Sequence, residues 1–344
     1  YPLGLRFCFV DPTPGSPAGE LGPQVARDYD SIEAQDALAS CDVVTYEFES
    51  VPVRAAEALT AKTRVLPPPS ALNVAQDRLS EKQCFRSLSI PTPEFAAVSS
   101  LKELQRACER IGLPAILKTR RLGYDGKGQA RLESPRDLEP AFERIGGSPL
   151  ILEGFVHFER ELSLIGVRGR DGSTAFYPLL ENQHRDGILR LTYAPARGVS
   201  EELRVKAERY MGALLEKLDY VGVLTLELFQ VQGELWANEM APRVHNSGHF
   251  SIEGAETSQF ENHLRAILGL PLGSTCVRQP SAMLNLIGAI PAREDVLRVP
   301  GAHLHLYGKN PRPGRKVGHI TLVAPTAGEL ETRLADLKKL AGAG

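Results

Sequence analysis

Residues 221–240 restrict the fold more than any other part of the chain. They read VGVLTLELFQVQGELWANEM, two alternating apolar runs joined by a short polar segment. Because successive side chains of a β-strand point to opposite faces, this pattern predicts an antiparallel hairpin with one face on a hydrophobic core. A three-residue turn centred on Gly233 would place Glu227 directly opposite Glu239 on the other face.

Facing glutamates need an explanation, because like charges directly opposite each other on a sheet are destabilising. Two carboxylates aimed at one point suit a hard cation such as Mg²⁺, which prefers oxygen ligands and shares them with phosphates. The alternative is a slipped register with both carboxylates in water. The spacing of Glu227 and Glu239 alone leaves both interpretations open.

The segment after the hairpin, NEMAPRVHNSGH at 238–249, adds Arg243 and His245. If the strand stays regular, both share the face of Glu239. An arginine there suits a small planar anion, which it can hold through two parallel hydrogen bonds. His245 and His249 are four residues apart, as in some zinc helices, but Asn-Ser-Gly between them disfavours a helix and no third ligand is obvious, so zinc is the weaker hypothesis.

A second segment, LKTRRLGYDGKGQ at 117–129, combines four cationic side chains with three glycines. Glycine lets main-chain N–H groups approach a ligand closely, and neighbouring cations suit an anion such as phosphate. The segment follows a predicted strand at 114–119, so we expect a phosphate-binding loop there. A glycine loop is weak evidence by itself.

The length of 344 residues predicts two or three domains. Apolar runs at 5–11 and 42–48 predict buried parallel strands of an open α/β sheet, and the Pro triplet at 67–69 marks its boundary. In such a sheet a strand and a glycine turn usually come earlier, so we expect that the natural N-terminus is missing here. Helices are predicted at 31–39, 53–61, 76–88, 100–112, 134–147 and 200–219, and antiparallel strands with Asp-Gly turns over 159–187.

The composition is that of a soluble globular protein, with 42% apolar and 24% charged residues. A formal net charge of −2 gives no electrostatic case for binding nucleic acid or an anionic membrane. No apolar run approaches the ~18 residues of a membrane-spanning helix. Five scattered cysteines favour reduced thiols. We therefore expect a cytoplasmic protein that acts on small anions.

Eight blocks in order make the chain resemble the ATP-grasp superfamily and, within it, the ATP-dependent carboxylases of purine biosynthesis that act on aminoimidazole ribonucleotide. The blocks are DVVTYEFE at 42–49, DRLSEKQ at 77–83, LKTRRLGYDGKGQ at 117–129, LEGFV at 152–156, FERELS at 158–163, ENQHRDGIL at 181–189, NEMAPRVHNSGH at 238–249 and YGKNPRPGRKVGHI at 307–320. The family's first strand and glycine-rich turn are absent from the front.

The resemblance implies an ATP-grasp fold of α/β and α+β type. Residues 1–75 would form an N-terminal Rossmann-like domain with an open parallel sheet, 76–265 the ATP-grasp domain with two subdomains around ATP, and 266–344 a small mixed C-terminal domain. It also implies ATP and Mg²⁺ as cofactors, bicarbonate and aminoimidazole ribonucleotide as substrates, and a homodimer.

The resemblance implies a role for each matching residue. The metal ligands would be Glu227 and Glu239, and the catalytic residues Arg243 for bicarbonate, His245 near the amine and Asn246. ATP would contact Arg78, Lys118, Gly123, Tyr124, Asp125, Gly126, Lys127, Gly128, Gln129, Glu153, Gly154, Phe155, Val156, Glu161, His184 and Asn238. The ribonucleotide would contact Glu47, Glu49, Lys309, Arg315 and Lys316.

Taken singly, most of these residues have simpler interpretations: Phe155 as core, Glu161 as a surface acid, and the basic loop at 307–320 as a solvated loop. Their joint order favours the functional interpretation. Two alternatives stay open: an ATP-grasp ligase with a different acceptor, and a nucleotide-binding regulator without catalysis.

Overall fold

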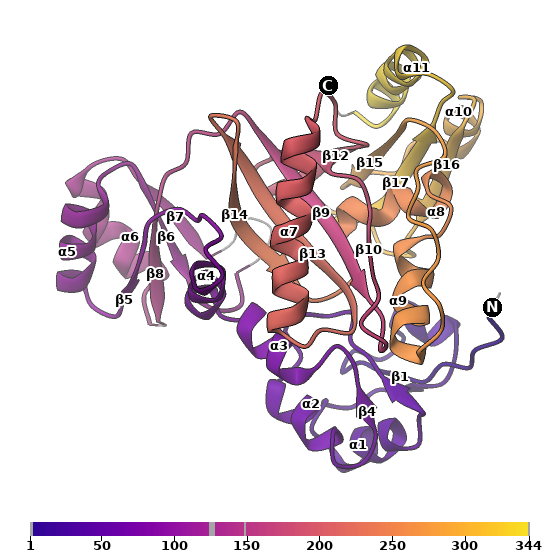
Figure 1. The fold of residues 1–344 in the computed structure, drawn as a ribbon, viewed down its shortest axis with the longest axis horizontal. Helices are drawn as coiled ribbons and strands as arrows, with labels where there is room; N and C mark the ends of the chain where they lie inside the picture. The colour runs from indigo at the N-terminus through magenta and orange to yellow at the C-terminus, as the bar shows by residue number, and fades with distance from the viewer. Residues whose placement is uncertain (1–2, 124–127, 148, 343–344) are drawn as a thin grey trace.

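The computed structural model describes residues 3–123, 128–147 and 149–342. Figure 1 shows three parts around a long twisted sheet: an N-terminal region, a lobe built on a small sheet, and a C-terminal region. None of the described helices is long and apolar enough to cross a membrane. All five cysteines are free thiols.

The N-terminal region holds two short parallel pairs rather than long buried strands. β1 (Phe9–Val10) pairs with β2 (Gln24–Val25), and β3 (Val43–Val44) pairs with β4 (Arg64–Val65). The predicted strands at 5–11 and 42–48 are therefore wrong in extent, and Phe7 is 36% exposed. Each strand has one short partner among the described residues, so few ladder hydrogen bonds hold it. The associated helices are η1 (Pro17–Glu20), α1 (Ile32–Ala39) and α2 (Val53–Leu59).

The Pro triplet begins a helix that the sequence did not predict. α3 (Pro69–Ala75) has Pro69 in its first turn, where a missing N–H costs nothing. α4 (Arg78–Ser87) follows at once, and the Asp77 side chain accepts hydrogen bonds from the N–H groups of Leu79 and Ser80. This cap fixes where α4 begins.

The small lobe is a four-stranded antiparallel sheet with two helices packed on it (Figure 1). Its core consists of side chains that alternate along the strands, such as Ala115 and Leu117, and of the apolar faces of the helices. The elements are β5 (Phe95–Val98), α5 (Leu101–Ile111), β6 (Ala115–Thr119), β7 (Gln129–Leu132), η2 (Pro135–Asp137), α6 (Leu138–Ile145) and β8 (Leu150–Gly154), with strand order β5-β8-β6-β7.

The large sheet runs without interruption from the central region into the C-terminal region. Its strand order is β14-β13-β9-β11-β12-β15-β17-β16, with β10 paired to β9. The strands are β9 (Arg160–Arg168), β10 (Thr174–Phe176), β11 (Leu180–Arg185), β12 (Ile188–Ala194), β13 (Gly222–Val231), β14 (Glu234–Ala241), β15 (Ser281–Ile287), β16 (Ala302–Leu306) and β17 (Lys316–Val323). The pairing of β12 with β15 joins the two regions.

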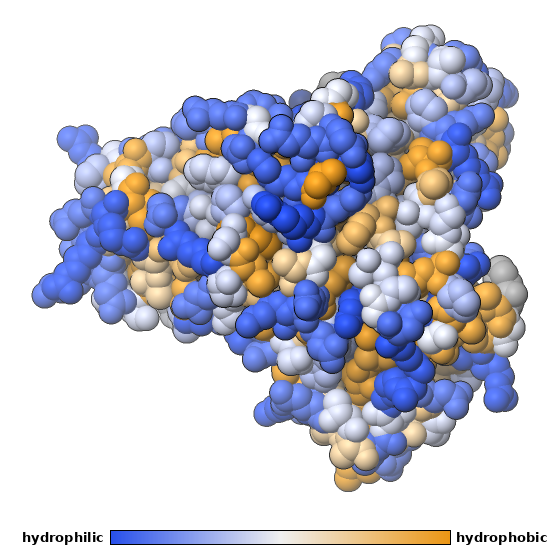
Figure 2. Space-filling view, viewed as in Figure 1, coloured by the Kyte–Doolittle hydropathy of each residue, from blue (hydrophilic) through white to orange (hydrophobic). Residues whose placement is uncertain are grey.

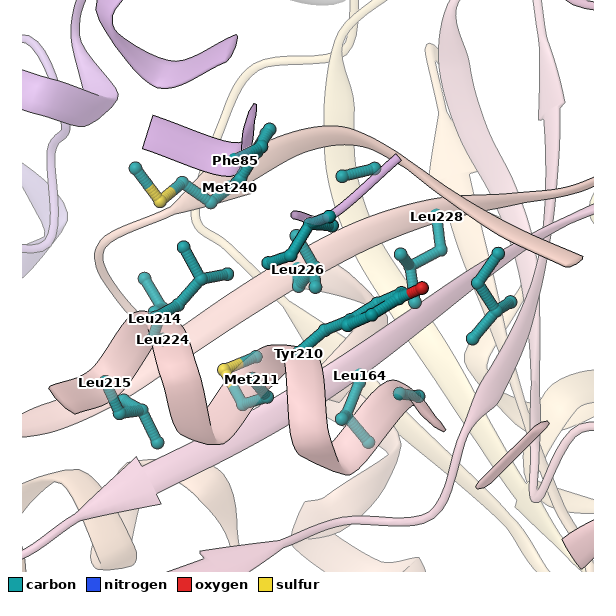
Figure 3. Packing of buried hydrophobic residues seen from close by; sticks show 14 of the residues in the cluster. Phe85, Leu164, Tyr210, Met211, Leu214, Leu215, Leu224, Leu226, Leu228 and Met240 are labelled. Carbon is teal, nitrogen blue, oxygen red and sulfur yellow. The ribbon is translucent and has the colours of Figure 1, made fainter. Parts of the chain in front are cut away.

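α7 (Glu201–Lys217) covers one face of this sheet and begins at the predicted cap, Ser200. Figure 3 shows its side chains Tyr210, Met211 and Leu214 among leucines of β13. The surface over α7 is largely hydrophilic in Figure 2, as expected for a helix with one buried face. The remaining helices are η3 (Asn246–Phe250), α8 (Ser251–Gly254), α9 (Gln259–Leu268), α10 (Arg293–Leu297) and α11 (Ala327–Leu340).

Candidate active site

The β13–β14 hairpin brings Glu227 opposite Glu239, as the sequence predicts, but through a different geometry. The turn has two residues, Gln232 and Gly233, both with positive φ. The register set by this turn would pair Glu239 with Leu226 and turn it toward the core. A β-bulge at Asn238 adds one residue to β14 and moves Glu239 to the face of Glu227.

A cleft of about 390 Å³ lies over this pair of glutamates. Residues from the N-terminal region, α4, the segment after β6, the hairpin, and the C-terminal region line it. Ten of the predicted site residues are among them: Glu49, Arg78, Gly123, His184, Glu227, Glu239, Arg243, His245, Asn246 and Lys316.

Each glutamate of the pair is held by a cationic or hydrogen-bonding neighbour. Arg78 Nη1 donates to Glu239 Oε2 at 2.8 Å, and His245 Nε2 lies 2.9 Å from Glu227 Oε1. Burial opposes ionisation of Glu239, but the charge and hydrogen bond of Arg78 outweigh it and lower its pKa. Glu239 therefore carries its negative charge at neutral pH.

Arg243 and His245 line the cleft although β14 ends at Ala241, so the regular strand on which their shared face was conditional does not extend to them. The chain turns into η3 instead, where the N–H of Ser247 and the imidazole of His245 form a local cap. Arg243 Nε and Nη2 donate to Glu49 Oε2 at 3.0 and 2.7 Å.

Asn246 is held by a reciprocal pair of amide hydrogen bonds. Its Nδ2 donates to Asn285 Oδ1 at 3.1 Å, and Asn285 Nδ2 donates to Asn246 Oδ1 at 2.7 Å. Asn285 belongs to β15, so this pair fixes η3 to the C-terminal part of the sheet.

His184 and Glu161 lie together on adjacent strands, β11 and β9, with His184 Nδ1 2.8 Å from Glu161 Oε2. Burial lowers the pKa of His184, but the hydrogen bond to Glu161 and the charges of Glu227 and Glu239 outweigh it and raise that pKa. His184, held by Glu161, thus lines the same cleft as Glu227 and Glu239.

Lys118 and Glu153 form an ion pair in the small lobe, with Lys118 Nζ 3.0 Å from Glu153 Oε2. Lys82 Nζ lies 3.4 Å from the same oxygen. Burial opposes ionisation of Glu153, but the charges of Lys118, Lys82 and Arg78 lower its pKa to about 2. The Glu153 carboxylate thus binds two lysines. Glu153 and Gly154 are the last residues of β8, and Phe155 and Val156 begin the link toward β9.

Phe155 is half-buried rather than core, and the Arg131 guanidinium lies 4.2 Å from the centre of its ring. Gly128 and Gln129, at the start of β7, are exposed. The predicted contacts Tyr124, Asp125, Gly126 and Lys127 lie outside the described residues.

The segment that precedes these four residues is fixed to the start of α4. Arg120 donates to both carboxylate oxygens of Asp77 at 3.0 and 2.8 Å, and Arg121 Nε donates to Asp77 Oδ2 at 3.2 Å. Arg78 Nη2 donates to the Gly123 carbonyl at 3.2 Å. Asp77, Arg120 and Arg121 were not predicted as site residues. No local pattern could have revealed their contact, because the two arginines follow Asp77 by 43 and 44 positions in the chain.

Of the five predicted ribonucleotide contacts, Glu49 and Lys316 line the cleft. Lys309 is exposed, and its Nζ lies 5.5 Å from the centre of the Tyr307 ring. Arg315 donates to the Asn310 carbonyl at 3.4 Å. Glu47 is exposed beside the cleft residue Glu49.

The residues present fit a hard divalent cation that shares its ligands with a phosphate. Two carboxylates, Glu227 and Glu239, face each other on the floor of a cleft that also holds cationic side chains. Among residues 3–123, 128–147 and 149–342, no group of three or more His, Cys, Asp and Glu side chains could hold a metal ion. The remaining ligands would therefore have to come from phosphate and water.

The two sheets, the basic glycine segment and the glutamate pair between them are features of the ATP-grasp class. Residues 83–260 match the family model of the ATP-grasp domain, residues 1–76 that of the ribonucleotide synthetase preATP-grasp domain, and residues 281–333 that of the phosphoribosylaminoimidazole carboxylase C-terminal domain. The chain belongs to the family of N5-carboxyaminoimidazole ribonucleotide synthases.

Similar proteins cover almost the whole chain. An N5-carboxyaminoimidazole ribonucleotide synthase from Pseudomonas aeruginosa is 52% identical over 98% of this chain and 94% of that protein. The crystal structure of the corresponding synthetase from Thermus thermophilus is 56% identical, with a TM-score of 0.95 over 99% of this chain and 93% of that one. The Aspergillus clavatus synthase, solved with ADP and 5-aminoimidazole ribonucleotide, is 35% identical, with a TM-score of 0.89 over 98% and 92% of the two chains.

Proposed function

We propose that this protein uses ATP and bicarbonate to carboxylate the amine of 5-aminoimidazole ribonucleotide, giving 5-(carboxyamino)imidazole ribonucleotide, ADP and phosphate in purine biosynthesis. One observation supports this most: a single cleft gathers Glu227, Glu239, Arg243 and His245 with Lys316 of the C-terminal region. The similarity to a synthase solved with ADP and 5-aminoimidazole ribonucleotide supports the same substrates.

The reaction needs two transfers, because bicarbonate is a poor electrophile. In the first, a bicarbonate oxygen attacks the γ-phosphorus of ATP, the bond to the β–γ bridging oxygen breaks, and ADP leaves. The product is carboxyphosphate. In the second, the amine nitrogen bonds to the carboxyl carbon, supplied by carboxyphosphate or by the CO₂ that it releases, and phosphate leaves while the amine loses a proton.

Phosphoryl transfer depends mainly on positioning and on charge neutralisation. Glu227 and Glu239 would hold Mg²⁺, which when bound neutralises phosphate charge. Arg78 and Lys118 would bind the nucleotide phosphates, and the pair of His184 and Glu161 would bind the ribose hydroxyls. The link from Glu153 to Val156 would bind adenine through its backbone.

Arg243 would bind bicarbonate through the fork that now holds Glu49, because a bicarbonate oxygen can accept the same two hydrogen bonds. His245 would orient the amine or carry its proton, with Glu227 beside its Nε2. Lys316, with Lys309 and Arg315, would bind the phosphate of the ribonucleotide. Asn246, held by Asn285, would orient either partner.

The test is release of ADP with each substrate omitted in turn. We expect release that requires both bicarbonate and 5-aminoimidazole ribonucleotide. Equal ADP release without the ribonucleotide would contradict the proposed acceptor, and nucleotide binding without ADP release would favour a regulator. We expect the active form to be a cytoplasmic homodimer, which sedimentation of the purified protein and fractionation of the cell would test.

A further inference from the structure

Two buried ionisable residues of α4 bind the backbone on either side of Glu239. Lys82 Nζ donates to the carbonyl of Asn238, the extra residue of the bulge. Glu81 Oε1 accepts a hydrogen bond of 2.6 Å from the N–H of Met240. The residue before Glu239 and the residue after it are therefore both attached to one helix.

The same face of α4 also binds the carboxylate itself. Arg78, Glu81 and Lys82 are spaced three and four residues apart, so they lie on one face of the helix. Arg78 Nη1 is 2.8 Å from Glu239 Oε2. Further along α4, Phe85 packs in the same hydrophobic cluster as the Met240 side chain, and Figure 3 shows the two side by side.

These contacts hold a backbone irregularity on which the site depends. A bulge leaves ladder hydrogen bonds unmade, so its carbonyl needs another donor. Lys82 supplies that donor and has no exposed surface, while its ammonium is also 3.4 Å from Glu153. A buried ammonium is stable only where acceptors surround it, so Lys82 and the Asn238 carbonyl stabilise each other.

We infer that Glu81 and Lys82 are positioning residues, which fix the bulge at Asn238 and thereby the carboxylate of Glu239 in the geometry that binds a divalent cation. The inference rests on the proposed metal site at Glu227 and Glu239. It does not require either positioning residue to touch the cation or a substrate.

The experiment measures binding of Mn²⁺ to the whole protein saturated with ADP, with free Mn²⁺ followed by electron paramagnetic resonance. E81M and E81Q are neutral and of similar size, but only glutamine keeps an acceptor for the Met240 N–H. K82M removes the donor to Asn238. K206M is the matched control, because Lys206 binds Glu234 at the far end of β14.

We expect Mn²⁺ to bind K82M at least tenfold more weakly than the wild type, and E81M at least fivefold more weakly than E81Q, while K206M stays within about twofold of the wild type. K82R keeps the buried charge and serves if K82M does not fold. Its planar group displaces the Asn238 carbonyl, so weaker Mn²⁺ binding is again expected.

Two results would overturn the inference. The first is that E81M and K82M, or K82R in its place, fold and bind Mn²⁺ like K206M. The second is that E81M, K82M and K82R all fail to fold while E81Q folds, which would assign the contacts to stability alone. The E239Q variant distinguishes failure of the positioning inference from failure of the proposed metal site. If Mn²⁺ affinity is unchanged in E239Q, the metal site itself is wrong. If E239Q weakens binding but the α4 variants do not, only the positioning role is wrong.

Discussion

Arg243 directs two of its N–H groups, on Nε and Nη2, at a single carboxylate oxygen of Glu49. The two residues come from different regions of the fold, since Glu49 follows β3 in the N-terminal region and Arg243 follows the hairpin. This pair keeps the guanidinium pointed into the cleft. A planar anion such as bicarbonate would have to replace the Glu49 oxygen to use the same fork.

We predict that R243A loses carboxylation but keeps its affinity for ATP. Removing a donor that stabilises developing charge typically lowers the rate about 100- to 1,000-fold. ADP release and ATP affinity, measured separately, test this. R168A is a suitable control, because Arg168 pairs with Asp219 away from the cleft. An equal loss of ATP affinity in R243A would instead place Arg243 on the nucleotide.

E239Q should remain folded and lose most ATP turnover, because glutamine lacks the charge that a divalent cation needs. We expect ADP release to fall by about 100-fold or more, a loss typical of removed electrostatic stabilisation. The control is E234Q on the same strand, whose partner is Lys206. Normal turnover of E239Q with Mg²⁺ would show that Glu239 is not a metal ligand.

Replacing Gly233 in the hairpin turn should lower stability without creating a steric clash. Gly233 has φ of +78°, and no atom lies within 4 Å of the position that a Cβ would occupy. G233A should therefore destabilise the protein by about 1 kcal/mol through backbone strain alone. Urea unfolding measures the difference. G212A is the control, since Gly212 lies within α7 with equally open space. Unchanged stability in G233A would argue against the positive φ.

His263 predicts how stability depends on pH. It is buried, its Nδ1 accepts the Val223 N–H at 3.1 Å, and its Nε2 lies 2.9 Å from Thr45 Oγ1. Burial lowers its pKa from 6.5 to about 4, so the folded state favours the neutral ring. The neutral ring's contribution to the free energy of unfolding is complete above pH 6.5 and is lost as the pH falls toward 4. By pH 5 the free energy of unfolding should have fallen by about 2 kcal/mol.

Urea unfolding at pH 7 and at pH 5 checks this prediction. H263Q should be less stable at pH 7 but should lack this component of the pH dependence. H157Q, which changes an exposed histidine, should keep it. A pH dependence in H263Q that equals the wild type would show that other groups cause the acid destabilisation.

The hairpin shows what alternation in a sequence can predict. The apolar face and the meeting of Glu227 with Glu239 were predicted correctly, because a period of two is written directly in the residues. The three-residue turn was wrong, and the unpredicted bulge at Asn238 compensated for it. The bulge depends on Lys82, 156 residues away in the chain, so no local pattern could reveal it.

The strand prediction for the N-terminal region failed for a different reason. Apolar runs predict burial, but the length of a strand depends on its partners, and β1 and β3 have only short ones among the described residues. The roles of Glu81 and Lys82 were missed as well, although Arg78 on the same helix was a predicted site residue. Glu81 and Lys82 look like an ordinary solvated helix face, because charge alone does not reveal burial.

The pairing of β12 with β15 limits how this chain can be divided. The C-terminal strands are hydrogen-bonded to the central ones along four residue pairs, so a fragment ending near residue 266 would leave β12 with one open edge. Exposed strand edges recruit other chains, and such a fragment should aggregate rather than behave as an independent nucleotide-binding module.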